Sequence, residues 1–153
     1  MQVIGTIFTK PNQFGDFNWM ISNPEYDNSL FIFNDNEEFH ETNRTGMGNA
    51  IIRQYNKYNR KLTKPKSAGI PTGTLAGGGY QELNSHVIQN VSGAIEEIKE
   101  LLNKYQYDSI CYSVGPNGKL GTGIFDVNTQ VINYIDKEIK ALSDLPVINI
   151  GLI

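Results

Sequence analysis

Short apolar runs separated by turn residues dominate the first part of the chain. They cover residues 2–9, 17–21 and 29–33, and each is rich in Val, Ile, Phe or Trp. Runs of this length, bounded by Pro, Asn and Gly, predict β-strands. The third run, Leu-Phe-Ile-Phe after Ser29, has no polar position, so it predicts a central strand buried on both faces. We expect the strand at 17–21 to pair back onto the first.

The second half of the chain carries helical spacing. A helix is expected from an N-cap at Asn84 or Ser85 to about Lys104, on the spacing of Val87, Val91, Ala94, Ile95, Ile98, Leu101 and Leu102. A buried strand is expected at 108–114 and a closing strand at 146–150. Between them, a helix with its first turn at 126–129 is expected on the spacing of Val131, Ile135, Ile139 and Leu142.

This alternation of strands and helices decides the fold class. A short loop between the helix ending near Lys104 and the strand at 108–114 suits a right-handed crossover. The sequence therefore predicts a single α/β domain over residues 1–153, with a mixed, largely parallel central sheet and helices on both faces.

Three glycine-rich segments interrupt these elements, at residues 45–49, 68–79 and 115–125. The first opens a helix from Asn49. The second fits no regular element and is expected to be a lid or a linker. The third joins the strand at 108–114 to the last helix. Carboxyl ends of parallel strands meet at one edge of a sheet, so these loops and the polar segment 34–40 are expected to lie together there.

Glycine loops of this kind favour an anionic ligand, because their backbone N–H groups can point at a phosphate. The chain has no lysine of the P-loop type after its glycines and no G-x-G-x-x-G turn after the first strand. Both the mononucleotide-kinase and the dinucleotide-dehydrogenase interpretations therefore lose support.

Charge and composition limit the classes of binding partner that are expected. The formal net charge is −3, whereas a nucleic-acid-binding domain is normally basic. The sequence shows no run long enough to span a membrane and no secretory signal at its start, so a cytoplasmic protein is expected. The single cysteine, Cys111, falls in a predicted buried strand, and we interpret it as a structural thiol rather than a nucleophile.

The order of these motifs resembles the macrodomain family. The motifs are the strand and asparagine loop FIFNDN, the glycine loop GMGNAIIR, and the strand and loop YDSICYSVGPNGKLGTGIF. In macrodomains a loop after a central strand lies near the distal ribose of ADP-ribose, and a later Gly-Thr-Gly-Ile-Phe-type loop wraps the diphosphate with backbone amides. The later loop matches closely, whereas the usual triple glycine of the earlier loop is missing and Gly77-Gly78-Gly79 stands in a different context.

The resemblance implies a set of ligand contacts. Thr122 and Gly123 would hold the diphosphate and Phe125 would pack on the distal ribose. The wider expected ligand-binding set is Asn34, Asn36, Gly46, Gly48, Asn49, Arg53, Gly121, Thr122, Gly123, Ile124 and Phe125. Segment 68–80 would close the cleft. The residue that reads the adenine is not identified.

The sequence offers fewer candidate side chains for catalysis than for ligand binding. His40 is the candidate acid or base because its ordinary pKa lies near neutrality, and Asn36 and Asn49 are candidates by resemblance. Arg53 is placed to reach a phosphate with two N–H groups. Tyr80 is a better candidate than Trp19 or Tyr112 for stacking on a base, since aromatic residues in strands usually belong to the core.

Three functions remain open at this point. The first is a binding module for ADP-ribose or a related nucleotide signal, which could sequester an immune nucleotide as phage-encoded decoys do, in the host cytoplasm. The second is an ADP-ribosyl hydrolase or ADP-ribose phosphate phosphatase. The third is a structural or interaction domain whose glycines only form turns. No metal and no cofactor is expected, and a homodimer is left open.

Overall fold

A computed structural model describes residues 1–123, 125–143 and 148–150. It contains a six-stranded sheet in the order β4-β3-β2-β5-β1-β6. The strands are β1 (Gln2–Thr6), β2 (Ser29–Asn36), β3 (Ser67–Thr74), β4 (Gly78–Gly79), β5 (Ser109–Ser113) and β6 (Ile148–Ile150). All pairs are parallel except β3 with β4. The predicted α/β class with a mixed, largely parallel sheet is confirmed.

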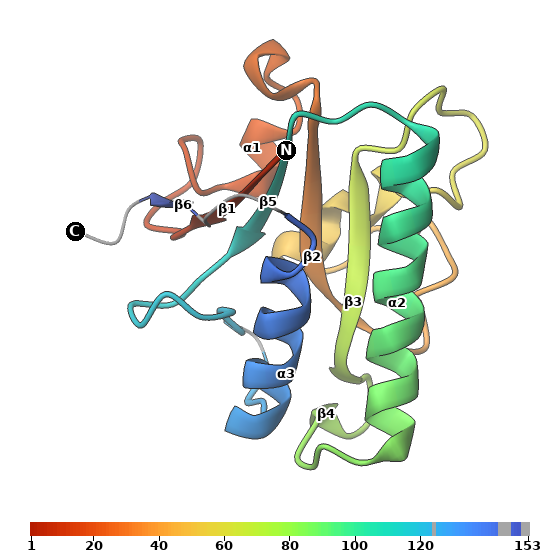
Figure 1. The fold of residues 1–153 in the computed structure, drawn as a ribbon, viewed down its shortest axis with the longest axis vertical. Coiled ribbons are helices and arrows are strands. Elements are labelled where there is room, and N and C mark those ends of the chain that lie inside the picture. Colours follow the sequence, from red (N-terminus) through yellow and green to blue (C-terminus); the bar gives the residue numbers. More distant parts are fainter. Residues whose placement is uncertain (124, 144–147, 151–153) are drawn as a thin grey trace.

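Helices cover both faces of this sheet. The long helix α2 (Ser85–Lys104) and α3 (Thr129–Lys140) lie side by side on one face, as Figure 1 shows. The short helix α1 (Phe17–Met20) and the 3-10 helices η1 (Pro24–Tyr26) and η2 (Gly48–Tyr55) belong to the opposite face. Each face encloses its own apolar cluster.

Strand β2 shows how the apolar pattern positions these layers. Leu30 and Ile32 point into the cluster beneath α2 and α3, whereas Phe31 and Phe33 point into the cluster beneath α1 and η2. All four side chains are buried, because successive residues of a strand face opposite sides of the sheet. The prediction of a central strand at 29–33 is confirmed, and the strand continues to Asn36.

The helices of the second half begin where their caps predict. The Asn84 side chain accepts a hydrogen bond from the Val87 backbone N–H at 3.0 Å, which makes Asn84 the N-cap of α2. Asn128 caps α3 in the same way, through Gln130 N–H at 2.8 Å. The strand predicted at 108–114 is β5. The closing strand is observed as β6, while Pro146 and Val147 lie outside the described residues.

Two sequence-based assignments are wrong. The segment predicted as a strand at 17–21 forms helix α1 (Phe17–Met20) with Ile21 as its C-cap. The Asp16 side chain accepts a hydrogen bond from the Asn18 N–H at 3.1 Å, and Phe17 and Met20, one turn apart, are both buried. Residues 67–74 form strand β3 rather than a loop. A Cβ on Gly69 would lie 2.4 Å from a carboxylate oxygen of Asp35, so this glycine permits close packing instead of marking a turn.

Candidate functional site at the carboxyl edge of the sheet

The two loops expected to form a ligand cleft do meet. Asn34, near the end of β2, donates a hydrogen bond from its side-chain amide to the carbonyl oxygen of Gly121 at 2.6 Å. The two residues are 87 positions apart in the sequence. Their contact joins the asparagine loop to the Gly-Thr-Gly segment at the edge where parallel strands end, which is where α/β sheets bind ligands.

A second contact joins the first turn of η2 to the same edge. Asn49 donates from its side-chain amide to the hydroxyl of Ser113 at 2.8 Å. Ser113 is the last residue of β5 and lies in register with Thr6, the last residue of β1. Thr6 is fully buried, and its hydroxyl has no hydrogen-bond partner within the part of the chain that the structure describes. Hydroxyl and amide groups thus gather at the ends of β1 and β5.

Ser113 and Thr6 were missed by the sequence-based search. Each is a polar residue at the last position of a mostly apolar strand, and that position could have singled them out. Their register, which places them side by side, depends on the pairing of β1 with β5 and is not visible in the sequence.

The segment between β5 and α3 is a closed turn followed by an open loop. Gly115 and Lys119 are joined by a backbone hydrogen bond of 2.8 Å, and Gly118 has a positive φ of 77° that favours glycine. Beyond this turn, a Cβ built on Gly123 would have no neighbour within 4 Å. Gly123 is exposed and Thr122 half-buried, Phe125 packs partly against the cluster under α2 and α3, and Ile124 lies outside the described residues.

The remaining asparagine and glycines of the expected site shape the loop that leads to it. The Asn36 side chain accepts from the Phe39 N–H at 3.1 Å and so stabilises the turn after β2. Gly48 has a φ of 58°. A Cβ on Gly46 would lie 2.9 Å from a guanidinium nitrogen of Arg53, so only glycine fits there.

Arg53 does not serve as the expected phosphate ligand. Its side chain is buried, and its guanidinium donates two hydrogen bonds to one oxygen of the buried Asp35, of which the Nε contact measures 2.9 Å. A third hydrogen bond of 2.9 Å goes to the carbonyl oxygen of Arg44. Because its donors are committed to the protein, Arg53 holds the loop before η2 in place rather than a ligand.

His40 is likewise not the free acid or base that the sequence suggests. Its Nδ1 lies 3.2 Å from Asp35 and its Nε2 lies 2.5 Å from Glu97 on α2. Burial lowers the pKa of His40, but the hydrogen bonds to the two carboxylates outweigh it and raise the pKa to about 9. A histidine protonated at neutral pH cannot accept a proton from a substrate. His40 instead ties the loop after β2 to α2.

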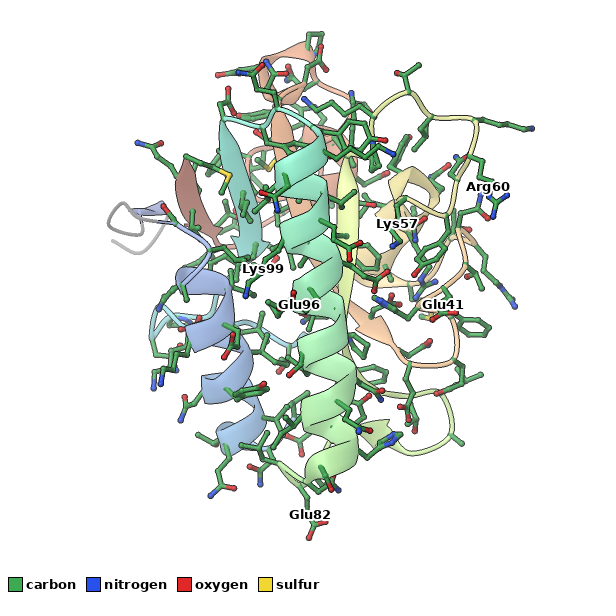
Figure 2. All side chains as sticks on the ribbon, turned by 45° about the vertical axis from the view of Figure 1, so that its right-hand side comes forward. Glu41, Lys57, Arg60, Glu82, Glu96 and Lys99 are labelled. Atoms are coloured by element: carbon green, nitrogen blue, oxygen red, sulfur yellow. The ribbon has the colours of Figure 1, made fainter. Side chains whose placement is uncertain are left out.

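Glu97 completes this link. Burial raises its pKa, but hydrogen bonds from His40 and from the Tyr58 hydroxyl lower it to about 2. Lys57 adds an ion pair at 3.2 Å. Figure 2 places Lys57 beside the sheet, away from Glu96 and Lys99 on the outer face of α2. A cavity of about 20 Å³, room for one water molecule, lies among His40, Tyr58 and Glu97.

The segment expected to close the cleft is fixed in the structure. Tyr80 is buried, and its hydroxyl donates to Glu37 at 3.2 Å, so it is not available to stack on a base. His86 and Asn90 on α2 contact the same Glu37 oxygen. Glu38 accepts from the Leu75 N–H at 2.5 Å, which pins the β3–β4 turn. Trp19 and Tyr112 are partly and fully buried, as expected of core residues.

The described residues contain no group of three or more His, Cys, Asp or Glu side chains that could hold a metal ion. In residues 1–123, 125–143 and 148–150, none of the helices is both long and apolar enough to cross a membrane. Comparison of the chain with protein-family models, with curated proteins and with solved structures found no match.

Proposed function

We propose that the protein binds a nucleotide of the ADP-ribose type at the carboxyl edge of its sheet. The hydrogen bond from Asn34 to Gly121 is the observation that carries this proposal, because it brings together two loops that were singled out independently from the sequence. The macrodomain resemblance gives the ligand class. The fold class is consistent with it, since α/β sheets bind ligands beyond the carboxyl ends of their strands.

The diphosphate would lie against the backbone of residues 121–123. Gly123 supports this placement, since the space in front of its Cα is open and a ligand can approach the main chain there. The adjoining helix α3 begins at Thr129, and its first turn carries no acidic side chain to repel an anion. Asn49 and Ser113, both half-buried, would offer polar groups to a ribose.

Binding without chemistry is the form of this function that the contacts favour. Both histidines that contact the segment 34–40 are held by carboxylates: His40 is a protonated bridge between Asp35 and Glu97, and His86 lies 2.7 Å from Glu37. Retention of an immune nucleotide, as in a phage-encoded decoy, would need no catalytic group. The proposal therefore places the protein among nucleotide-binding modules, with an ADP-ribosyl hydrolase as the competing outcome of the test.

The test is a thermal-shift titration with ADP-ribose, NAD, AMP and cyclic ADP-ribose isomers. A ligand at 100 times its dissociation constant adds about 2.7 kcal/mol to the free energy of unfolding, a rise in Tm of several degrees for a chain of this size. The stabilising ligand is then recovered from denatured protein and chromatographed. Intact ligand supports binding, altered ligand supports hydrolysis, and no shift with any member of the panel contradicts the proposal.

A variant pair separates the site from general effects. Gly123→Val places a branched side chain in the open space before the loop, so it should abolish the ligand-induced shift while leaving the Tm of the free protein nearly unchanged. Gly93→Val is the matched control, because Gly93 on α2 also has nothing within 4 Å of a built Cβ. Loss of the shift in both variants, or in neither, would count against residues 121–123 as the ligand contact.

A further inference from the structure

A hollow of about 430 Å³ lies at the opposite edge of the sheet, where strands β1, β2 and β5 begin. Its volume is within the range of small-molecule pockets, about 300–1,000 Å³. The floor is made by residues of three neighbouring strands, and the register of the sheet places Ser29 beside Ser109 and Ile4 beside Cys111. Three of these four side chains are small, which leaves room above the sheet.

The walls of the hollow are aromatic. Phe14, from the loop between β1 and α1, and Tyr26, from η1, have ring centroids 6.2 Å apart with their planes at 46°. The Tyr26 ring also meets the buried Phe31 ring edge-on at 6.5 Å, which fixes its orientation. Phe14, Tyr26 and Ile4 are each half-buried, so part of their apolar surface faces the hollow.

The rim is acidic. Glu25 and Asp108 line the hollow and are exposed. Within the described residues, neither carboxylate has a lysine or arginine partner. The two nearby lysines are engaged elsewhere, Lys66 in an ion pair with Asp27 at 3.1 Å and Lys64 with the carbonyl oxygen of Gln106. The lining itself contains no basic residue.

A chain of hydroxyl groups connects the floor to this rim. The Ser29 and Ser109 hydroxyls are 2.8 Å apart, and the Ser109 hydroxyl also donates to Asp108 at 3.1 Å. The Asp108 carboxylate is therefore held at the mouth of the hollow. The Cys111 thiol below does not form a reactive thiolate, since burial raises its pKa to about 12. An occupant would be held without a covalent bond.

We propose that this hollow binds a small organic cation, an ammonium group carried on an aromatic or short apolar body. Glu25 and Asp108 would hold the ammonium group, and Phe14 and Tyr26 would cover the apolar body, with a cation–π contribution from the rings. An anion would be repelled by the two carboxylates. This site uses none of the residues of the proposed nucleotide site and is independent of it.

The experiment is an NMR titration of the ¹⁵N-labelled protein with 2-phenylethylammonium. Its counterpart is 3-phenylpropanoate, which has a similar shape and the opposite charge. The ammonium probe should shift the backbone amide signals of Tyr26, Ser109 and Cys111 with a dissociation constant on the order of 1 mM, the strength expected of a fragment of this size. The carboxylate probe should not shift these signals at the same concentrations.

Two double variants test the charge argument. Glu25→Gln with Asp108→Asn should weaken the binding of the ammonium probe about fivefold or more. Both carboxylates are exposed, so each contributes modestly. Glu82→Gln with Glu100→Gln removes the same charge from exposed positions elsewhere and should leave the binding constant unchanged. Figure 2 labels Glu82 at the amino end of α2.

Three results would overturn the proposal. The first is the absence of shifts in the signals of Tyr26, Ser109 and Cys111 when the ammonium probe is present at tens of times the expected dissociation constant. The second is an equal response to both probes, or an equal response in both double variants, because the acidic rim would then have no role. The third is movement of these signals with protein concentration alone, which would assign the hollow to an interface between copies of the chain.

Discussion

His40 shows how surroundings decide what a residue can do. Alone in the sequence it is a candidate base, and in the fold it is a cation held between Asp35 and Glu97. Its folded-state pKa of about 9 exceeds the ordinary value of 6.5. A raised pKa means that protonation stabilises the folded state, and this contribution is complete below about pH 6.5 and lost as the pH rises through 9.

We predict that the wild-type protein loses stability on the order of 2 kcal/mol between pH 6.5 and 9.5 through His40. His40→Gln removes the titrating group and should flatten this dependence, which urea unfolding at several pH values would measure. His86→Gln is the matched control, since His86 is exposed and also contacts a carboxylate, and it should keep the wild-type slope. Identical slopes in wild type and His40→Gln would refute the assignment.

The Glu97 side of the link has the opposite dependence. Its pKa is lowered to about 2 from 4.5, so its contribution is present above about pH 4.5 and disappears as the pH falls through 2. Both contributions are complete between pH 4.5 and 6.5. The contact between His40 and Glu97 should therefore stabilise the folded protein most between pH 4.5 and 6.5.

Arg53 supplies a second residue-scale prediction. Arg53→Lys keeps the charge but cannot reproduce the paired N–H groups that meet Asp35 or the third that meets the Arg44 carbonyl. The free energy of unfolding should fall by about 2–4 kcal/mol, as expected when a buried ion pair loses its geometry. Arg60→Lys, at an exposed position labelled in Figure 2, should change it by less than about 0.5 kcal/mol. If the two variants lose the same free energy of unfolding in chemical denaturation, the structural role of Arg53 is refuted.

Local patterns predicted most helices and strands, because these elements follow from their own sequence. The strand at 29–33, helix α2 with its Asn84 cap and helix α3 are all present. Strand β3 was missed because its glycines allow contacts across the sheet, which no local pattern reveals. The meeting of the two loops was predictable, because the carboxyl ends of parallel strands lie at one edge of a sheet. The partners of His40 and Arg53 were not, because they depend on contacts between distant parts of the chain.

Glycines in different elements should respond to substitution in opposite directions. Gly93→Ala fills open space on an exposed helix position and should raise the stability by about 0.5–1 kcal/mol, because alanine is the better helix former. Gly73→Ala would place a Cβ 2.2 Å from the Gly78 carbonyl oxygen and should break the pairing of β3 with β4. Calorimetry of both variants would measure these changes in stability. A Gly73→Ala protein as stable as the wild type would contradict the observed β3–β4 register.

At the scale of the molecule, one sheet carries both proposed sites at its two ends. The nucleotide site uses residues where β1, β2 and β5 finish, and the cation site uses residues where the same three strands begin. Along β5, Ser109 in the floor of the hollow and Ser113 in the nucleotide site are four residues apart, about 13 Å at 3.3 Å per residue, with Cys111 between them. Substitutions at this separation without shared contacts normally add in free energy, so Gly123→Val should leave the cation site intact.

The two apolar clusters on either side of the sheet should unfold together, because the same strands line both. Trp19 packs against the cluster beneath α1 and η2, whereas α2 and α3, which dominate the helical signal, cover the other. Urea curves followed by tryptophan fluorescence and by far-ultraviolet circular dichroism should therefore coincide. Ile98→Val, which removes one methyl group beneath α2, should destabilise the protein by about 0.5–1.5 kcal/mol and shift both curves equally. A shift of the dichroism curve alone would mean that the two faces of the sheet are separate cooperative units rather than one domain.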